Sequence, residues 1–421
     1  MPVRTVCFCN SNRPWGGGEK WHMDAALALA ERGWRTLVLC HPKGELFRRL
    51  QGATGISLLP FPLGRLSFLN PCTRFRLTRL FREERVDALI TNLPADLKAA
   101  APAAKAAGVD KIIHRRGSAL PVRNSALNRR LYGKTISGLI VNSEATRRLA
   151  LINNPALIPQ ERIAVLPNGL DVDAFDAALD AAGEIGFLSE GNACSPIVGT
   201  RERQSRPFVF GNAGRLTGQK GQHMLLHLCR KLLDAGLDCM VVIAGTGERE
   251  AELTSLAAEL GLGERAVFPG FMEDLAPFWR GIDLFVLSSL WEGFGMVLIE
   301  AMLAQKPVFA FAVSNIPELV FEDGDNGNGK LFPLPEEEMA HCPYVATTSG
   351  STDSHNTTRS AADEPYSGLA PLVDAVLELA SNPESGKRMG LAGRRFALRF
   401  SQNSCMDVLE SLLTQSWDQQ G

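Results

Sequence analysis

Two glutamates stand at opposite ends of one short apolar segment. The stretch SSLWEGFGMVLIEAM, residues 288–302, has Glu292 before its helix and Glu300 within it. The run DLFVLSS predicts a strand and a helix is predicted from Met296, so Glu300 lies about 6 Å along the helix axis. The two carboxylates therefore cannot bind the same atoms. They can bracket a ligand, because carboxylates accept hydrogen bonds from hydroxyl pairs and a helix N-terminus attracts an anion. Acids that merely favour the helix dipole explain Glu292 well but Glu300 poorly.

A second segment supplies two cations. The stretch GRLTGQKGQ, residues 214–222, also follows a predicted strand and precedes a predicted helix. Ligands of open parallel α/β sheets bind at the carboxyl edge of the strands, where such loops lie. Arg215 can hold phosphate oxygens bidentately and Lys220 acts as a compact point charge, so together they suit a diphosphate leaving group. Two solvated cations on a turn are the alternative for this motif alone.

The first predicted loop is rich in glycine. In RPWGGGEKW, Gly17, Gly18 and Glu19 follow the first predicted strand and begin a predicted helix. Glycines let backbone amides approach an anion at a helix N-terminus, so Gly17 and Gly18 are candidate ligand-binding residues. Consecutive glycines do not meet the dinucleotide-binding fingerprint, and a flexible first loop is the alternative.

These loops need elements that place them on one sheet edge. Apolar or β-branched runs alternate with helical patterns through residues 1–170 and again through 207–400, which predicts an α/β fold with two parallel-sheet domains. The periodicity fades through residues 171–206, a linker or insertion. Residues 322–366 are polar and are expected to form a mobile surface loop. A helix at about 402–418 is expected to pack back on the first domain.

Length and composition limit the classes of protein to which the chain can belong. A chain of 421 residues is too long for one ordinary core, so roughly two to three domains are expected. With 45% hydrophobic and 21% charged residues, the chain has the balance of a folded soluble protein. Nine scattered cysteines without CxxC pairs favour reduced core thiols over disulfides or a zinc site. We expect neither a signal peptide nor a membrane span, and a cytoplasmic location.

The ordered motifs resemble a known family. GRLTGQKG followed by EGFGMVLIE is similar to the phosphate-binding pair and the E-x7-E motif of family-4 retaining glycosyltransferases with the GT-B fold. GGGEK, VNSEATRRL, VLPNGLDVDAF, VIAGTGE and VFPGF also appear in the family's order, so the resemblance covers most of the chain. It implies two Rossmann-like parallel-sheet domains facing each other across a cleft. The first would bind the acceptor and the second the nucleotide sugar.

The resemblance also implies roles in donor binding. Arg215 and Lys220 would hold the donor diphosphate, Glu300 the ribose hydroxyls and Glu292 the hydroxyls of the donor sugar. Three backbone amides would line the phosphate or the sugar, those of Gly293, Phe294 and Gly295. The glycine loop of the first domain would add Gly17 and Gly18 to the donor-binding residues.

One histidine completes the expected catalytic set. His114 closes the strand KIIH where the family has a histidine facing the donor sugar, although a lone histidine at a strand end is more often structural. The catalytic candidates are then Glu292, His114, Arg215 and Lys220. Acceptor binding is assigned to Glu19, Arg115 and Arg116.

One motif could suggest a metal ion. DVD at residues 171–173 looks like the metal-binding motif of the other glycosyltransferase fold, but it lies at the domain junction. We interpret it as a turn and expect no metal or other cofactor.

The first part of the chain is basic. Residues 1–170 hold 26 Lys and Arg against 11 Asp and Glu. Many of the arginines lie in or beside CTRFRLTRLFREER, at positions 65, 74, 76, 79, 82 and 85, together with Phe75, Leu77, Leu80 and Phe81. A basic amphipathic helix can lie on an anionic membrane surface, and the solvated face of a surface helix is the alternative. The charge favours an anionic or membrane-embedded acceptor. Nucleic acid is not expected, because no recognised binding motif is visible.

We therefore expect a glycosyltransferase that moves a sugar from a nucleotide-diphosphate donor to an acceptor hydroxyl with retention. Lipopolysaccharide, cell-envelope or other glycan biosynthesis is the expected setting. A nucleotide-sugar epimerase on the same scaffold is one alternative, and it would convert the donor without an acceptor. A non-catalytic sugar-nucleotide-binding protein that docks on membranes is another. The donor's base and sugar and the acceptor's identity are not readable from these residues.

Overall fold

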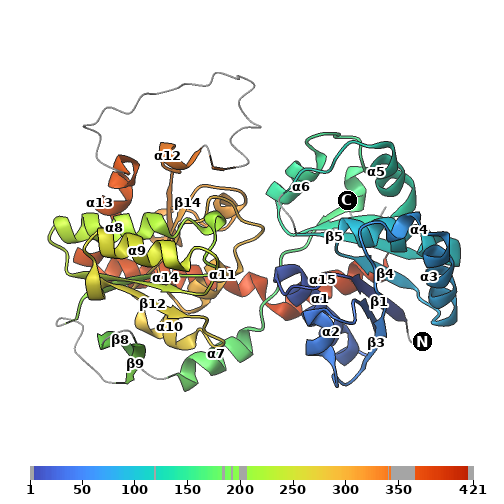
Figure 1. The fold of residues 1–421 in the computed structure, drawn as a ribbon, viewed down its shortest axis with the longest axis horizontal. Coiled ribbons are helices and arrows are strands. Elements are labelled where there is room, and N and C mark those ends of the chain that lie inside the picture. The colour runs from blue at the N-terminus through green and yellow to red at the C-terminus, as the bar shows by residue number, and fades with distance from the viewer. Residues whose placement is uncertain are drawn as a thin grey trace. The chain divides into compact units, whose positions relative to one another are not determined.

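The chain folds into two compact units, which are drawn in Figure 1. The computed structural model describes residues 4–117, 120–182, 185–190, 193–198, 206–339, 341–342 and 366–415, with only the backbone at 185–190, 193–198 and 325. Unit 1 comprises residues 1–169 and 402–421, and unit 2 comprises residues 170–401. Among the described residues, no helix is long and apolar enough to cross a membrane.

Unit 1 contains a seven-stranded parallel sheet in the order β3-β2-β1-β4-β5-β6-β7. Its strands are β1 (Thr5–Asn10), β2 (Arg35–Cys40), β3 (Ile56–Pro60), β4 (Ala88–Thr91), β5 (Lys111–Arg116), β6 (Gly138–Val141) and β7 (Ile163–Val165).

Helices cover both faces of this sheet because its strands are apolar on both faces. Within β1, Val6 and Phe8 pack into a core cluster with α1 and α15, whereas Cys7 and Cys9 pack into another with α3 and α4. Successive side chains of a strand point to opposite faces, which explains the alternation. The helices of unit 1 are α1 (Gly17–Glu31), α2 (Glu45–Leu50), α3 (Pro71–Glu83), α4 (Pro94–Ala107), α5 (Ala126–Arg130), α6 (Glu144–Leu151) and α15 (Gln402–Thr414).

Unit 2 contains a six-stranded parallel sheet in the order β12-β11-β10-β13-β14-β15. Its strands are β10 (Phe208–Ala213), β11 (Cys239–Ala244), β12 (Ala266–Gly270), β13 (Leu284–Leu287), β14 (Val308–Phe311) and β15 (Gly329–Phe332). Its helices are α7 (Val172–Ala181), α8 (His223–Asp234), α9 (Glu250–Glu259), α10 (Ala276–Gly281), α11 (Met296–Leu303), α12 (Glu336–Met339), α13 (Ala370–Ser381) and α14 (Pro383–Ala397).

The predicted α/β fold class, with two Rossmann-like parallel sheets, is confirmed. The helix expected at about 402–418 is α15, which lies in unit 1, where Trp34 Nε1 donates to Glu410 Oε1 at 2.8 Å.

Two expected irregular segments hold regular structure. The 171–206 segment contains α7 and a hairpin of β8 (Ile185–Glu190) and β9 (Ala193–Val198). Asp171 of the DVD motif caps α7 by accepting from the Ala174 amide at 3.0 Å. The expectation of a loop throughout 322–366 was wrong for residues 329–332, because GKLF pairs with β14 as the edge strand β15, and for Glu336–Met339, which form α12. Residues 340 and 343–365 lie outside the described residues.

Candidate functional site

The two motif loops of unit 2 meet because their strands are neighbours. Strands β10 and β13 pair in parallel, so both carboxyl ends lie on one edge of the sheet. The backbone amide of Leu290 donates to the carbonyl oxygen of Gln219 at 2.8 Å, and the Gln219 side chain returns a bond to the Trp291 carbonyl oxygen at 2.9 Å. The loops are thus locked together.

Gly221 permits this close approach. Its φ of 59° lies in the left-handed region, and a Cβ there would lie 2.3 Å from the carbonyl oxygen of Ser288. Only glycine fits such a contact without moving one of the loops. The Ser288 hydroxyl also donates to the Lys220 carbonyl oxygen at 2.8 Å, which holds the backbone of the cation in place.

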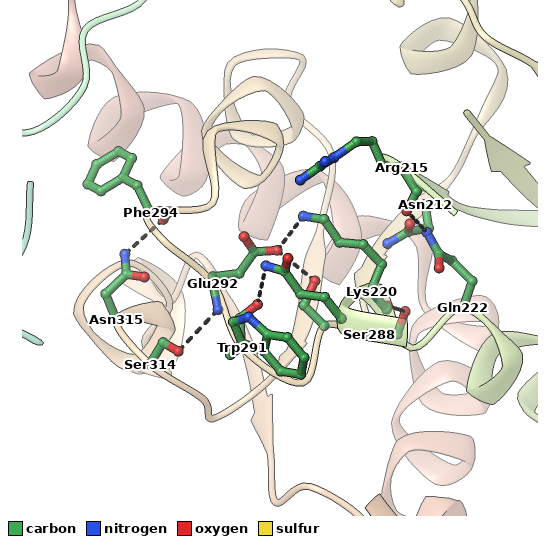
Figure 2. A network of polar contacts seen from close by, with 12 residues as sticks. Asn212, Arg215, Lys220, Gln222, Ser288, Trp291, Glu292, Phe294, Ser314 and Asn315 are labelled. Atoms are coloured by element: carbon green, nitrogen blue, oxygen red, sulfur yellow. Dashed lines mark hydrogen bonds and ion pairs between the residues drawn. The ribbon is translucent and has the colours of Figure 1, made fainter. Parts of the chain in front are cut away.

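Lys220 and Glu292 form an ion pair at the centre of this edge. Lys220 Nζ lies 2.6 Å from Glu292 Oε1, and the side chains are 16% and 6% exposed. The Ser289 hydroxyl donates to the same oxygen at 2.6 Å. Figure 2 shows the lysine reaching across to the carboxylate. The described residues form no hydrogen bond with the second oxygen, Oε2, so that atom can accept from a ligand.

Arg215 adds a second cation to the same loop. Its side chain is exposed, and the described residues offer it no ion-pair partner. Gln222 fixes the backbone below it, because Nε2 donates to the Arg215 carbonyl oxygen at 3.1 Å. In Figure 2 the side chains of Arg215 and Lys220 point the same way. An anion at this position would meet two positive charges.

A third loop, which the sequence motifs did not single out as part of the site, supports the first. The amide of Leu216 donates to the carbonyl oxygen of Thr246 at 3.0 Å. A Cβ on Gly245 would lie 2.0 Å from the Gly214 carbonyl oxygen, and one on Gly247 would lie 2.2 Å from that of Leu216. The glycines of VIAGTGE therefore allow two loops to pack backbone against backbone.

The turn between Glu292 and α11 is held by side chains from another loop. The amide of Glu292 donates to Ser314 Oγ at 3.1 Å, and Asn315 Nδ2 donates to the Phe294 carbonyl oxygen at 2.8 Å. Ser314 has a φ of 52°, a left-handed conformation that a serine rarely adopts. Gly295, with a φ of 86°, precedes the first residue of α11.

The buried side chain of Phe294 is not available to a ligand, so any contact of this residue with one would involve its backbone. Its side chain is 5% exposed and its ring packs edge to face on Phe400, with centroids 5.8 Å apart. Gly293 and Gly295 flank it in the turn, as the motif predicts. Their contact with a ligand stays a prediction.

Glu300 lies apart from the ion pair. It lines a cavity of about 200 Å³ together with Glu273 and Asp274, which follow β12. Glu292 does not line this cavity. The two glutamates therefore present their carboxylates to different spaces, although the role of each stays a prediction.

Unit 1 has its own pocket at the carboxyl ends of β1, β4 and β5. The pocket has a volume of about 630 Å³. Its lining includes Gly18 and the three residues expected to bind the acceptor, Glu19, Arg115 and Arg116. Gly17 begins α1 beside them and is not among the lining residues. The three residues to which the sequence assigned acceptor binding therefore line one cavity, as a shared binding site would require.

Buried groups shape the wall of this pocket. A Cβ on Gly18 would lie 2.7 Å from Asn92 Nδ2, so the loop before α4 packs closely on the start of α1. Asp96 ties the loops after β1 and β4 together, accepting from the amides of Ser11 at 3.1 Å and Leu93 at 3.3 Å. Burial raises the pKa of the Asp96 carboxyl to about 6. No motif had pointed to Asp96.

His114 does not line the pocket. It is fully buried, its Nδ1 lies 3.0 Å from Thr91 Oγ1, and its ring packs edge to face on Tyr132. Burial, helped by the charge of Arg116, lowers the pKa of His114 to about 3, so the ring is neutral near pH 7. The expected contact of His114 with a donor sugar stays a prediction.

The apolar face of α3 is not available to a membrane. Leu77 and Phe81 are buried in the core of unit 1, at 0% and 1% exposure, so this face packs on the protein. Phe75 is 69% exposed. In the preceding segment, Leu66 is 70% exposed and Leu69 is 65% exposed. The helix therefore cannot lie on a bilayer by the face that the pattern indicated.

Two family models match the chain. The model described as Glycosyltransferase Family 4 matches residues 15–174, and the one described as Glycosyl transferases group 1 matches residues 199–341. Together the matches cover most of the chain. They include both motif loops of unit 2 and the glycine loop of unit 1.

Curated proteins and solved structures agree with these matches. The UDP-Gal:alpha-D-GlcNAc-diphosphoundecaprenol alpha-1,3-galactosyltransferase of Escherichia coli is 24% identical over 291 residues, 66% of this chain and 71% of that protein. An uncharacterized glycosyltransferase of Methanocaldococcus jannaschii is 30% identical over 164 residues, 38% of this chain and only 39% of that protein. The structure of HepE from Anabaena in complex with UDP-glucose has a TM-score of 0.69 at 20% identity, covering 97% of this chain and 99% of that chain.

Proposed function

This chain belongs to glycosyltransferase family 4 and has the GT-B fold, and from this premise we propose that it moves a sugar from a nucleotide-diphosphate donor to an acceptor hydroxyl. One observation carries the proposal. Lys220 and Glu292 meet at 2.6 Å on the carboxyl edge of the unit 2 sheet, beside Arg215 and the N-terminus of α11. Two cations beside a carboxylate suit a ligand in which a phosphate is attached to a sugar, because the cations can bind the phosphate and the carboxylate can accept from sugar hydroxyls.

The role of the two cations in this proposal is to stabilise the leaving diphosphate. As the bond between the anomeric carbon and the phosphate oxygen breaks, negative charge grows on the diphosphate. Arg215 and Lys220 stabilise that charge, and the N-terminal end of α11 adds a favourable dipole. In this proposal the side chains supply the positive charge, with no metal or other cofactor. Within the described part of the chain, no cluster of His, Cys, Asp and Glu is arranged to hold a metal ion.

The two glutamates bind hydroxyls in this account. Glu292 Oε1 already accepts from Lys220 and Ser289, which stabilises the carboxylate and leaves Oε2 for a hydroxyl of the donor sugar. Glu300, in its separate cavity, accepts from the ribose hydroxyls. A carboxylate stabilised in this way is a weak nucleophile, which supports a binding role for Glu292.

Retention of configuration is the stereochemical part of the proposal. The acceptor oxygen bonds to the anomeric carbon on the face that the phosphate leaves, and the departing phosphate oxygen takes the acceptor proton. If Glu292 formed a covalent glycosyl intermediate instead, the Glu292→Gln enzyme would lose turnover entirely. Residual turnover with retained configuration in that variant supports the single-step route.

The setting that we propose is cell-envelope or other glycan synthesis. The relative from Escherichia coli is named for transfer to a sugar on diphosphoundecaprenol, and a matched mannosyltransferase of Rhizobium meliloti is named for lipopolysaccharide core biosynthesis. A lipid-linked acceptor would bring the enzyme to a membrane surface. Exposed Leu66, Leu69 and Phe75 are then among the apolar side chains available for peripheral contact.

A donor panel tests the activity. The full chain is incubated with nucleotide-diphosphate sugars, with and without sugar acceptors linked to a polyprenyl diphosphate, and products are separated by mass. We expect one donor to release its nucleoside diphosphate and a glycosylated acceptor to form. A changed donor sugar in the absence of acceptor would show an epimerase instead. Turnover at the wild-type level in both Lys220→Ala and Glu292→Gln would contradict the site assignment.

A further inference from the structure

We propose that the pocket of unit 1 binds a phosphate group carried by the acceptor, and that Arg115 is its central ligand. The proposal rests on the proposed function, since it takes this pocket as the acceptor site. It adds the chemical class of the acceptor: a hydroxyl compound that bears a phosphate ester or diphosphate near the reacting sugar.

Arg115 is a buried cation without an anionic partner. It is 3% exposed, and its guanidinium donates to neutral oxygens, Asn168 Oδ1 at 2.6 Å and Asn92 Oδ1 at 3.5 Å. Its Cζ also lies 4.8 Å from the centroid of the Trp21 ring. No carboxylate of the described residues lies within ion-pair distance of it.

The burial of Arg115 without an anionic partner is unfavourable until an anion binds. Burial lowers the pKa of Arg115 to about 10, and only the more distant Glu19 opposes this effect. The guanidinium stays charged at neutral pH, so its desolvation is not compensated within the described structure. A buried polar group that lines a pocket and lacks its natural partner indicates a ligand that supplies the partner.

Four further cations line the same pocket as Arg115. Arg116 is 8% exposed, one of its terminal nitrogens donates to the Leu120 carbonyl oxygen, and its buried Nε has no hydrogen-bond partner among the described residues. The other three cationic lining residues are Arg65, Lys98 and Arg123. Glu19 is the one acidic residue in the lining of this pocket. The local charge is strongly positive.

This pattern suits phosphate better than a single carboxylate. A phosphate monoester or diphosphate carries about two negative charges at neutral pH, whereas a carboxylate carries one, and several cations line the pocket. A guanidinium offers two parallel N–H groups that match two phosphate oxygens. The N-terminal turns of α1 and α4 also lie at this edge, represented in the lining by Gly18 and Pro94. Both helix dipoles favour an anion there.

Binding of a sugar phosphate to the full chain tests the proposal. N-acetylglucosamine 1-phosphate is titrated calorimetrically into wild type, Arg115→Met, Lys220→Met and the control Arg130→Gln, an exposed arginine of unit 1 outside the pocket. We expect Arg115→Met to weaken binding about 10- to 100-fold, because a charge-assisted bidentate contact is lost. Lys220→Met and Arg130→Gln should bind within about threefold of wild type.

The variants separate this proposal from the assignment of the donor site. Loss of sugar-phosphate binding in Lys220→Met, with full binding in Arg115→Met, would overturn the proposal and leave the donor site of unit 2 intact. Equal affinity for free N-acetylglucosamine would also overturn it. If Arg115→Met does not fold, the rim double variant Lys98→Gln/Arg123→Gln decides, and unchanged affinity there contradicts the proposal.

A second set of titrations distinguishes the source of the phosphate. The competing ligands are the same sugar phosphate in solution and a sugar linked to undecaprenyl diphosphate in detergent micelles. A lipid-borne source predicts that the lipid-linked compound displaces the soluble one at lower concentration and that Leu66→Ser/Leu69→Ser reduces only its affinity. A soluble source predicts no advantage for the lipid. Both results support phosphate recognition, and failure of both compounds to bind overturns it.

Discussion

The two candidate sites of this protein differ in how a buried cation is paired. In unit 2, the buried Lys220 is paired with Glu292 at 2.6 Å, and the second cation, Arg215, is exposed to solvent. In unit 1, the buried guanidinium of Arg115 faces amide oxygens and an aromatic ring. The buried cation of the proposed donor site is therefore paired before a ligand binds, whereas in our proposal the buried cation of unit 1 is paired by an anion that the acceptor brings.

The contrast has a direct consequence for substitutions. Removing one member of a buried ion pair leaves the other charge unpaired, which is strongly destabilising. Removing a buried cation that has no partner leaves only neutral groups behind. The same chemical change, from a cation to methionine, should therefore have different effects on folding in the two units.

The largest expected effect is that of Lys220→Met. We expect a loss of about 100- to 1000-fold in kcat, because one charge that stabilises the leaving diphosphate is removed. We also expect a loss of about 2–4 kcal/mol in the free energy of unfolding, because Glu292 stays buried without its partner. Steady-state release of nucleoside diphosphate and urea denaturation measure the two effects.

A double variant separates these two effects. Lys220→Met/Glu292→Gln removes both charges, so it should recover most of the stability and none of the activity. If Lys220→Met is as stable as wild type, the ion pair does not matter for folding and the comparison between the units fails.

Gly221→Ala should have the next largest effect. Its Cβ would lie 2.3 Å from the Ser288 carbonyl oxygen at a φ of 59°, so the two motif loops must separate. We expect a loss of about 1–3 kcal/mol in the free energy of unfolding and a parallel fall in donor affinity. Gly218→Ala is the matched control, because no atom lies within 4 Å of its added Cβ. Equal effects of the two changes would show that loop contact is not the cause.

Arg115→Met tests the comparison between the two units at the buried cation of unit 1. We expect the free energy of unfolding of the ligand-free protein to change by less than about 1 kcal/mol, because the desolvated charge is removed and the methionine stem keeps the contact with Trp21. The measurement is urea denaturation beside Lys220→Met under the same conditions. A loss as large as that of Lys220→Met would mean that Arg115 has a stabilising anionic partner within the protein.

The effect that is smallest near pH 7 concerns the protonation of His114. Burial holds the pKa of His114 at about 3 in the folded protein, below its usual value of about 6.5 when unfolded. The unfolded chain then binds the proton more readily, so this residue's contribution to stability is present above pH 6.5 and is lost progressively as pH falls towards 3. The expected slope is about 1.4 kcal/mol per pH unit for one proton.

Denaturation of wild type and His114→Gln at several pH values isolates this contribution. The difference in the free energy of unfolding between the two proteins should shrink as pH falls from 6.5. Asp96 has the opposite sign, because its raised pKa of about 6 favours the protonated folded state. The comparison of variants cancels that contribution. A constant difference between the two proteins would contradict the buried neutral histidine.

The sequence predicted the parallel sheets and the neighbouring motif loops, because apolar alternation and glycine-rich turns are local signals. It could not predict that Lys220 and Glu292 bind each other, since 71 residues separate them along the chain and only the pairing of β10 with β13 brings them together. The burial of His114 likewise depends on packing against Tyr132, which is not encoded near the strand KIIH.

Other differences between the sequence predictions and the structure also arise from tertiary packing. The amphipathic pattern of α3 was read correctly as a helix, but its apolar face packs on the core of unit 1. The strand β15 was missed because four residues within a polar segment carry little periodic signal and gain their order from β14. The positioning residues Ser314 and Asp96 belong to no motif, and Ser289 was given no role within the stretch 288–302, so only their hydrogen bonds identify them.

The central claim is that Arg215 and Lys220 of unit 2 hold the diphosphate of the donor. Calorimetric titration of the full chain with a panel of nucleoside diphosphates tests it most directly, with wild type beside Arg215→Met/Lys220→Met. We predict that at least one nucleoside diphosphate binds wild type and that the double variant binds it about 100-fold or more weakly. Equal affinity of the two proteins for that nucleotide would contradict the account.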